Sequence, residues 1–411
     1  KLSAAGKKDD LLTFEELGID FMFIDEAHMF KNCFVHTKLS RIAGVNTTSS
    51  QRAFDVLMKC QYLQEINNGR GVVFATGTPV SNSMSEMYVM MRYLEPDVLR
   101  DMGVSDFDSW AATFGRIVAS LEITPEGGGW RMRQRFARFV NLPELMQAYR
   151  LVADIQTADM LKLERPSIKG GKAEVISTDV TEFQRDIMEG FVERAEAIRA
   201  GRIDPHEDNM LKLTGEARLM AIDPRLIDRN APNDPQTKLN LCIDNVFCIW
   251  QDTAAGRLTQ LVFCDVSTPG ADDAMEMQEA SEGAYEKSVD RFTNVYEEIR
   301  KCLVRRGVPE EEVAFIHDAK SDPQRQAMFE QMREGKIRIL LGSTGKLGTG
   351  VNVQDRVIAI HHLDVPWKPS DITQRDGRGL RQGNINPEIM IFHYITVGTF
   401  DAYLWVRHEV A

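Results

Sequence analysis

The sequence predicts an α/β protein made of two lobes, each built on a parallel sheet, with the first lobe incomplete. Short continuous apolar runs alternate with helical patterns, which is typical of parallel strands because helices cover both faces of such sheets. Two of these runs precede residue 97 and five follow residue 259, so only the second lobe has enough strands for a whole sheet. A chain of 411 residues is also too long for one hydrophobic core.

The composition is that of an ordinary globular protein, with 43% hydrophobic and 27% charged residues. No apolar run approaches the ~20 residues that cross a bilayer, and Lys1 to Asp10 lacks the pattern of a signal peptide, so we expect a cytoplasmic protein. The cysteines have no CxxC pair and no histidine at ligand spacing, which predicts reduced core thiols and no metal site of their own. They are Cys33, Cys60, Cys242, Cys248, Cys264 and Cys302.

The first apolar run, Phe21 to Ile24, is followed at once by Asp25 and Glu26. We expect a buried strand with both acids at its carboxyl end, the edge at which open α/β sheets bind ligands. Nucleotide hydrolases use such a pair, in which one carboxylate helps to hold magnesium and its neighbour orients the attacking water. Taken alone, the stretch also fits a strand that ends in two solvated acids.

A helical pattern from Gln51 to Ile66 leads into the second run, Val72 to Ala75. Thr76 and Thr78 then place two hydroxyls at the same sheet edge as the acids, with a glycine between them that permits a tight turn. Asn82 falls one turn into the helix that follows. The alternative is an ordinary turn before an N-capped helix.

The sequence contains no Gly-x-x-x-x-Gly-Lys-Ser/Thr phosphate loop. The Gly-Lys pairs that begin at Gly6, Gly171 and Gly345 lack the first glycine and the hydroxyl that such a loop requires. Because two strands cannot form a doubly covered sheet, we expect the first lobe to be cut from a longer protein.

Residues 97–172 are predicted as a separate region, with helices from Trp110 to Val118 and from Leu142 to Ile155 around a loop tip at 125–129. Four arginines alternate with apolar residues after this tip. The pattern fits either a hairpin with one solvated face or a surface that grips the backbone phosphates of a duplex. The net charge of −12 argues against nucleic acid, so the expectation depends on this local cluster. The arginines are Arg131, Arg133, Arg135 and Arg138.

Residues 173–238 are predicted as a helical bridge and linker. Lys172 to Thr178 fits a strand, Thr181 caps a helix that runs to about Ala200, and Pro232 to Lys238 is rich in turn-forming residues. This region therefore connects the first lobe to the second.

Residues 239–411 form the predicted second lobe, in which five apolar runs alternate with helices and make a complete parallel sheet. An acidic stretch from Asp265 to Asp290 interrupts this alternation and is predicted as an insert. The expected strands are Gln260 to Cys264, Val313 to Ile316, Arg338 to Leu341, Val357 to His361 and Ile389 to Tyr394.

Two stretches of the second lobe suit phosphate chemistry. Residues 342–350 hold four glycines and three hydroxyls, which excludes a helix interior and suits a loop whose N–H groups approach phosphate. Arg378 and Arg381 are three residues apart, on one face if helical, and their always charged forks match the charge on a transferring phosphoryl group. A solvated basic helix is the alternative, although two glycines would weaken it. We expect His361 and His362, which end a strand nearby, to be structural.

Together these motifs resemble those of the superfamily-two helicases. Asp25 to His28 (Asp-Glu-Ala-His) is similar to motif two, and Thr76 to Asn82 (Thr-Gly-Thr-Pro-Val-Ser-Asn) is similar to motif three of the Snf-type translocases. The loop at 342–352 is similar to motif five, and Gln374 to Gly383 contains the Gln-x-x-Gly-Arg-x-x-Arg of motif six. Motifs two to six thus occur in order along the chain.

A closer resemblance is to the helicase region of large methylase-helicase fusion proteins of bacterial mobile elements and phages. It is carried by the runs Phe14 to Gly18, Val73 to Pro79 and Gly398 to Leu404. No Asn-Pro-Pro-Tyr or Asp-Pro-Pro-Tyr methylase motif is present, so methyl transfer is not expected of these residues.

The resemblance implies two RecA-like lobes, the first truncated near residue 96, with a helical insertion and an ATP site at the lobe interface. Asp25 is expected to hold magnesium, Glu26 to orient water, and Arg378 and Arg381 to act as arginine fingers. The residues expected to bind ATP are Gln374, Gly348, Gly350 and Thr76. Those expected to couple ATP to DNA are Thr78, Asn82, Ser343 and Thr344, with Arg131, Arg133 and Arg135 as further DNA contacts.

The same resemblance implies an ATP-dependent translocase or helicase that acts on double-stranded DNA. Motif one is absent, so these 411 residues are expected to hydrolyse ATP only together with an upstream phosphate-loop and methylase region of the same polypeptide. The alternative is a non-hydrolysing DNA-binding or scaffolding module of a larger DNA-modifying protein. The acid pair and both arginines argue against it, because a scaffold does not need them.

Overall fold

The computed structural model of the chain describes residues 13–39, 42, 45, 50–80, 83–123, 130–161, 163–204, 206–269, 292–347, 352–402 and 404–405. The predicted loop tip at 125–129 and most of the predicted acidic insert lie outside these described residues. The chain divides into two compact units, each with its own hydrophobic core. Unit 1 comprises Lys1–Glu122 and Trp130–Thr157, and unit 2 comprises Ile123–Gly129 and Ala158–Ala411.

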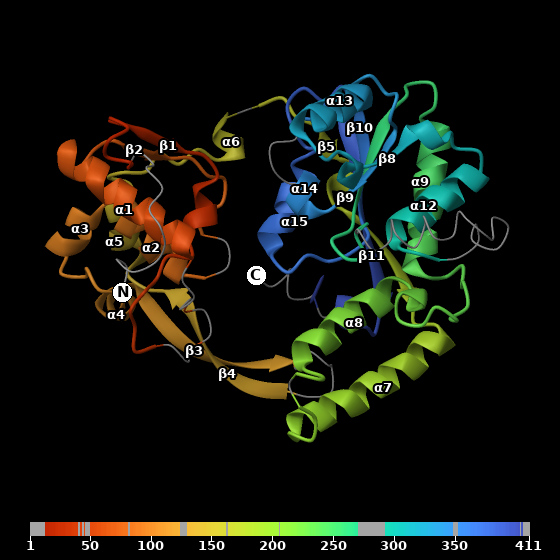
Figure 1. Cartoon of the computed structure of the whole chain (residues 1–411), viewed down its shortest axis with the longest axis horizontal. Coiled ribbons are helices and arrows are strands. Elements are labelled where there is room, and N and C mark those ends of the chain that lie inside the picture. The colour runs from red at the N-terminus through yellow and green to blue at the C-terminus, as the bar shows by residue number, and fades with distance from the viewer. Residues whose placement is uncertain are drawn as a thin grey trace. The chain divides into compact units, whose positions relative to one another are not determined.

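Unit 1 contains a two-stranded parallel sheet (Figure 1). β1 (Met22–Ile24) pairs with β2 (Val72–Phe74), and α1 (Gln51–Ile66) connects them. The side chain of Ser50 caps α1. The predictions of both strands and of this helix are confirmed. Further elements of unit 1 are η2 (Ala27–Phe30), α2 (Ser85–Leu94) and α3 (Pro96–Asp101).

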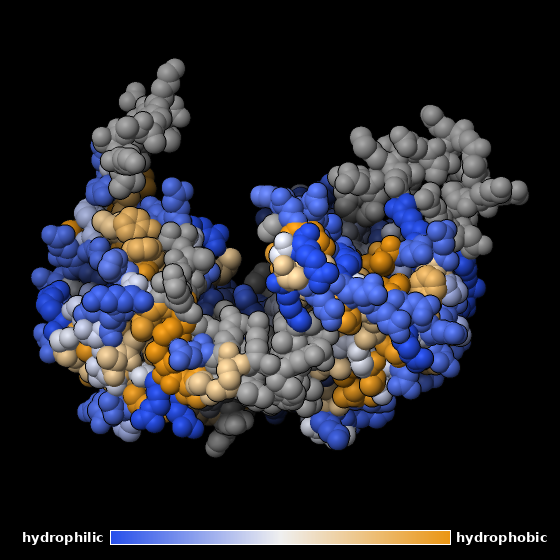
Figure 2. Space-filling view, turned by 90° about the horizontal axis from the view of Figure 1, so that it is seen from below, coloured by the Kyte–Doolittle hydropathy of each residue, from blue (hydrophilic) through white to orange (hydrophobic). Residues whose placement is uncertain are grey.

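The strands of unit 1 are not buried on both faces, contrary to the prediction for Phe21 to Ile24. Met22 and its neighbours on one face pack against the core, whereas Phe23 on the other face is 76% exposed and Val73 opposite it is 41% exposed. In the part of the chain that the structure describes, this sheet has two strands, too few to carry helices on both faces. Apolar residues are also seen on the face of unit 1 that Figure 2 shows.

A β-hairpin follows the helices of unit 1. α4 (Phe107–Phe114) ends where β3 (Gly115–Ile123) begins, and β3 pairs with β4 (Trp130–Phe139). The predicted helix from Trp110 to Val118 is therefore wrong after residue 114. A Cβ on Gly115 would lie 2.0 Å from the ring of Phe136, so this close approach requires glycine where the strand begins.

The next helix, α5 (Leu142–Tyr149), ends earlier than the predicted Ile155. Trp110, Phe136 and Leu145 belong to the same hydrophobic cluster as the buried residues of α1 and α2. The hairpin region therefore shares one core with the first lobe. The domain boundaries expected from the sequence stay predictions.

Unit 2 is built on a seven-stranded parallel sheet with the order β5-β11-β10-β7-β9-β8, and β6 also pairs with β11. The sequence places five strands in the second lobe, and the structure adds β5 and β6 from the predicted insertion and bridge. The strands are β5 (Ser167–Ile168), β6 (Glu174–Asp179), β7 (Thr259–Phe263), β8 (Val313–Phe315), β9 (Ile339–Gly342), β10 (Val357–His362) and β11 (Glu388–Val397).

Helices cover both faces of this sheet, which confirms the predicted α/β fold (Figure 1). Val262 of β7 packs in the cluster of α9 and α12, whereas Leu261 and Phe263 pack in that of α13. Thr181 and Gln184 form a capping box on α7, as predicted for Thr181. The helices are α6 (Ala158–Leu161), α7 (Glu182–Arg199), α8 (Met210–Ile222), α9 (Lys238–Asp252), α12 (Val295–Arg305), α13 (Asp322–Arg333), α14 (Thr344–Leu347) and α15 (Pro369–Asp376). The 3-10 turns are η3 (Lys169–Gly171), η4 (Pro224–Leu226), η5 (Glu310–Glu312), η6 (Ile316–Asp318) and η7 (Gln354–Arg356).

The described residues form neither a membrane-spanning helix nor a cluster of metal ligands. None of the helices they form is long and apolar enough to cross a membrane. They contain no group of three or more His, Cys, Asp or Glu side chains placed to hold a metal ion. All six cysteines are free, but Cys248 is exposed and Cys302 is half-buried, so the prediction of core thiols is wrong for these two.

Candidate functional site

The acid pair of unit 1 lies where β1 ends. The N–H of Ala75 donates to the carbonyl of Ile24 over 2.8 Å, which holds the ends of β1 and β2 together. Asp25 Oδ1 accepts a hydrogen bond of 2.8 Å from the N–H of Glu26. Glu26 has a φ of 51°, in the left-handed region, which costs a residue other than glycine roughly 1–2 kcal/mol. Backbone strain of this kind is frequent at functional sites.

His28 connects the acid pair to the Thr-Gly-Thr turn. Its Nδ1 lies 3.2 Å from Glu26 Oε2 and 3.1 Å from Thr76 Oγ1. Thr76 Oγ1 in turn accepts a hydrogen bond of 3.1 Å from the N–H of Thr78. The structure thus brings together the acids and the hydroxyls that the sequence places at one sheet edge. Sequence reasoning did not include His28 among the site residues, although it ends the Asp-Glu-Ala-His motif.

Several predicted site residues cannot be placed in this geometry. Asn82, Gly348 and Gly350 lie outside the described residues. For Arg131 and Arg133 the structure describes the backbone of β4 but not the side chains. The DNA and nucleotide contacts expected of these residues therefore stay predictions.

Three segments of unit 2 meet at the carboxyl edge of its sheet. Asp265 follows β7, Thr344 begins α14 after β9, and Asp364 follows β10. Asp265 Oδ1 accepts a hydrogen bond of 2.5 Å from the N–H of Thr344, and Oδ2 accepts one of 2.8 Å from its hydroxyl. Asp364 Oδ2 accepts one of 2.8 Å from the N–H of Asp265. Residues 344–347 form one helical turn, so the prediction of a wholly non-helical loop is wrong at this point.

Arg375 of α15 is fully buried at the same edge. Its Nη2 donates to Asp265 Oδ2 over 2.8 Å and to Asp364 Oδ1 over 3.0 Å. Burial alone would raise the pKa of Asp265, but the charge of Arg375 and the hydrogen bonds from Thr344 outweigh it and lower that pKa. Asp265 is therefore a carboxylate at neutral pH. Sequence reasoning missed this residue and Arg375, because a buried charge cannot be told from a solvated one by spacing.

The two predicted arginine fingers follow α15. The helix ends at Asp376, so Arg378 and Arg381 lie in turns and not on one helical face. Arg378 is half-buried, Arg381 is exposed, and Gln374 lies within α15. A Cβ on Gly379 would lie only 2.7 Å from the side chain of Ile389, so only glycine allows this turn to pack on the sheet.

The two neighbouring histidines of β10 are buried, as expected of structural residues. His361 contacts Tyr394 and Gln260, and burial lowers its pKa to about 3, so it stays neutral. His362 Nε2 lies 2.7 Å from Asp376 Oδ1. This second contact ties the end of α15 to the sheet beside the arginine-bearing turn.

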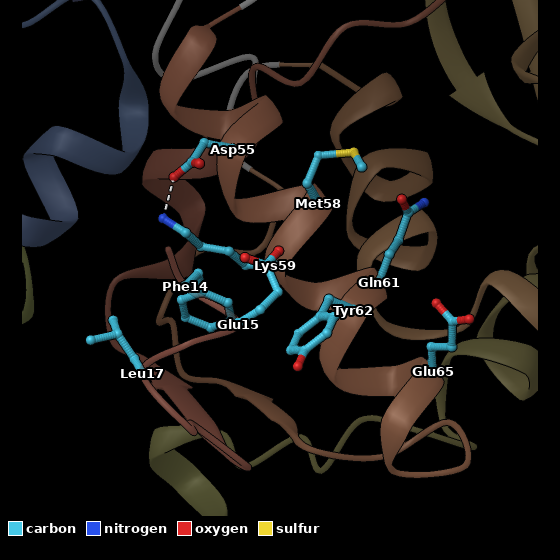
Figure 3. Close-up of a pocket in the computed structure, with 9 residues that line it drawn as sticks. All are labelled: Phe14, Glu15, Leu17, Asp55, Met58, Lys59, Gln61, Tyr62 and Glu65. Carbon is cyan, nitrogen blue, oxygen red and sulfur yellow. Dashed lines mark hydrogen bonds and ion pairs between the residues drawn. The ribbon is translucent and has the colours of Figure 1, made fainter. Parts of the chain in front are cut away.

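A pocket in unit 1 is lined by residues of α1 and of the segment 14–17 (Figure 3). Its volume is about 720 Å³, and its wall includes Phe14, Met58 and Tyr62. The ring of Phe14 packs edge-on against Tyr62, and Lys59 Nζ lies 5.5 Å from the centre of the same ring. None of the predicted site residues lines this pocket.

Glu95, at the end of α2, is a buried acid in unit 1. It is 3% exposed, and among the described residues neither carboxylate oxygen has a hydrogen-bond partner. Burial raises the pKa of Glu95 from 4.5 to about 7. The folded state therefore keeps a proton that the unfolded chain loses, so stability is full below pH 4.5 and falls as the pH rises toward 7.

Replacing Glu95 with Gln is expected to remove this pH dependence. At about pH 8 the variant should be more stable than the wild type by up to about 3 kcal/mol, because no charge has to be buried. At about pH 4 the two should be alike, since both side chains are then neutral. Urea denaturation at both pH values, with Glu65→Gln on the surface of α1 as control, measures the difference. Parallel stability curves for wild type and Glu95→Gln would contradict the raised pKa.

Comparison with known proteins gives matches over both units. Residues 2–157 match a family described as a probable helicase domain, and residues 277–383 match the helicase conserved C-terminal domain. "Defense against restriction protein B" of Escherichia phage P1 is 21% identical over 95% of this chain and 22% of its own length. "Helicase SWR1" of Candida glabrata is 26% identical over 46% of this chain and 11% of its own length. The C-terminal part of the Fun30 ATPase domain covers 59% of this chain and 89% of that chain, with 12% identity and a TM-score of 0.41.

The chain spans about a fifth of the length of the phage relative and about a tenth of the yeast relative. The two helicase matches follow one another along the chain. They include the acid pair of unit 1 and the arginine-bearing turn of unit 2. Both units are therefore similar to helicase domains, which supports a helicase-type motor region.

Proposed function

We propose that this chain is the motor segment of an ATP-dependent DNA translocase or helicase of the Snf type. One observation carries the proposal, namely that each unit gathers its predicted chemical groups at the carboxyl edge of parallel strands. Asp25, Glu26 and Thr76 lie there in unit 1. In unit 2 Thr344 lies there, and it is contacted by Arg375, three residues before Arg378. That edge is where open α/β sheets bind nucleotides.

The residues of unit 1 fit a magnesium-dependent reaction. Magnesium is usually held by one or two carboxylates together with substrate phosphates and water, and not by an all-protein cage. Asp25 is an exposed carboxylate at the strand end, which suits this role. When bound, magnesium neutralises charge on the terminal phosphates of ATP. Glu26, held by His28, is proposed to orient and activate the attacking water.

In unit 2, Arg378 and Arg381 are proposed to stabilise the charge that builds on the transferring phosphoryl group. Ser343 and Thr344 are proposed to couple the nucleotide to DNA, together with Thr78 and Asn82 of unit 1. Gln374, Thr76 and the glycines at 348 and 350 are proposed to bind ATP. The buried contacts of Thr344 support this assignment, because they fix the backbone that would face the ligand.

Hydrolysis is proposed to need a phosphate-binding loop that these 411 residues do not contain. The relatives are several times longer than the chain, which supports a role within a larger polypeptide. A methylase region in that polypeptide and a location in the cytoplasm are further proposals, derived from the resemblance alone. The alternative function is a scaffold that binds DNA without hydrolysis.

The ATPase rate of the complete protein, measured with and without duplex DNA, tests the proposal. We expect DNA to raise the rate, because superfamily-two motors couple the two ligands through segments such as 343–347. A protein that binds duplex DNA but hydrolyses no ATP at any DNA concentration would be the scaffold of the alternative hypothesis.

The arginines of β4 give a second test of DNA binding. Alternate positions of a strand share a face, so positions 131, 133 and 135 lie on one face and position 138 on the other. Replacing Arg133 and Arg135 with Ala is expected to weaken duplex binding and to reduce the slope of log affinity against log salt by about 2, because two phosphate contacts are lost. Fluorescence anisotropy across a salt series measures this slope.

The matched control is Arg138→Ala, which removes the same charge from the opposite face and is expected to leave the slope unchanged. If Arg133→Ala/Arg135→Ala keeps the wild-type slope, the cluster is a solvated hairpin face and not a DNA contact.

A further inference from the structure

Two buried arginines of unit 2 converge on Asp364. Arg375 Nη1 donates to the carbonyl of Asp364 over 3.0 Å, and its Nη2 reaches Asp364 Oδ1 over 3.0 Å. Arg218 of α8 donates from Nη2 to the carbonyl of Val365 over 2.9 Å and lies 3.5 Å from Asp364 Oδ2. Asp364 and Arg375 are at most 2% exposed, and Arg218 is 9% exposed. Burying so many charges is costly unless each is paired.

The guanidinium of Arg375 also reaches the segment after β9. Its Nε donates to Thr344 Oγ1 over 2.8 Å, while Nη2 reaches Asp265 over 2.8 Å. The charges of Arg375 and Arg218 therefore balance those of two carboxylates, Asp265 and Asp364. Every side-chain nitrogen of Arg375 has a hydrogen-bond acceptor. Through these bonds α15 is joined to the ends of β7, β9 and β10.

We propose that Arg375 is a positioning residue that locks segment 343–347 and the turn with Arg378 into one rigid arrangement. Asp265 and Asp364 supply its counter-charges. Arg218 contacts Asp364 as well and so connects the arrangement to α8. The role rests on the proposed function, since it assigns these two segments to one ATP cycle. Arg375 itself is fully buried and would touch neither ATP nor DNA.

An arginine is required at this position and a lysine does not replace it. The planar fork presents donors in fixed directions to Thr344, Asp265 and Asp364 at once. A lysine keeps the charge but holds three rotatable donors on a single nitrogen, so it loses the simultaneous contacts. Arg375→Lys thus separates the positioning role from the need for a buried positive charge.

Arg225 provides a matched control within the same unit. It is 7% exposed and pairs with Asp223 and Glu298 over 2.8 Å, so it is also a buried arginine between two carboxylates. Among the described residues its hydrogen bonds go to Asp223 and Glu298, and not to segment 343–347 or to α15. Arg225→Lys is therefore expected to cost stability without displacing the two segments.

The experiment compares both variants in the complete protein. For Arg375→Lys we expect kcat of the DNA-stimulated ATPase to fall by about a hundredfold, the cost of a misplacement of about 1 Å, with KM for ATP within about twofold. Hydrogen exchange should rise in residues 343–347 and 377–383 but not in β7 or β10. Arg225→Lys should leave kcat and both segments as in the wild type.

Equal effects of Arg375→Lys and Arg225→Lys on kcat and exchange would overturn the proposal. Should Arg375→Lys fail to fold, Asp265→Asn removes one counter-charge with the same shape and must give the same local rise in exchange. An ATPase-inactive wild type would refute the proposed function alone, because the exchange comparison still decides whether Arg375 locks the two segments.

Discussion

Replacing Arg378 with Gln is expected to lower the DNA-stimulated ATPase rate of the complete protein by about 10³- to 10⁵-fold, the usual contribution of an arginine finger. Gln is polar and of similar length, but it carries no charge to oppose the negative charge of the transferring phosphoryl group. The half-buried position of Arg378 increases the effect, because water screens its charge less. Phosphate release at saturating ATP and DNA measures the rate.

Arg381→Gln is expected to act in the same direction. The control is Arg306→Gln, which removes a guanidinium that pairs with Asp244 at 2.6 Å on the surface of unit 2. Its rate should equal that of the wild type, since a surface ion pair contributes little. If Arg378→Gln lowers the rate no more than Arg306→Gln does, the turn after α15 takes no part in hydrolysis.

Several of the predicted site residues stand at the end of a strand. Asp25 follows β1, Thr76 lies two residues beyond β2, and Ser343 follows β9. Local sequence is enough here, because the apolar run marks the strand and parallel strands end at a common edge. The contact of His28 with Thr76 was not predicted, since a histidine after two acids has no distinctive spacing.

The features that were missed depend on contacts between distant segments. Arg375 and Asp265 are 110 residues apart in sequence, and a chain position cannot show that an arginine is buried rather than solvated. Helix α4 stops at Gly115 where the ring of Phe136 from the next strand packs. Phe23 was expected to be buried because its run is apolar, yet burial also depends on how many strands and helices surround it.

Gly377 and Gly379 are unfavourable inside a helix, but Gly379 allows close packing after the helix has ended. In a helix Gly377 and Gly379 would be unfavourable, and the structure indeed ends α15 before both. Gly379 then packs where a Cβ would lie 2.7 Å from Ile389 and 3.0 Å from Ile360. Gly377 is thus the C-cap at which α15 ends, and Gly379 lets the turn that contains Arg378 pack closely on the sheet.

Glu26→Gln is the matching test for unit 1. The variant keeps the length of the side chain, and its amide oxygen can still accept a hydrogen bond from His28, which lies 3.2 Å from Glu26 Oε2. Only the negative charge that would draw a proton from the attacking water is lost. We expect the DNA-stimulated rate to fall by about 10²- to 10⁴-fold, the usual contribution of a general base. Stopped-flow phosphate release measures it.

Nucleotide affinity distinguishes this role from a structural one. Because Glu26 is proposed to act on water and Asp25 to hold magnesium, Glu26→Gln should bind a fluorescent ATP analogue as tightly as the wild type, while Asp25→Asn should bind it more weakly. A loss of affinity in Glu26→Gln would mean that its left-handed backbone and its contact with His28 shape the pocket and that the charge has no chemical role. An unchanged rate would remove Glu26 from the mechanism altogether, and with it the strongest argument from unit 1 against a scaffold.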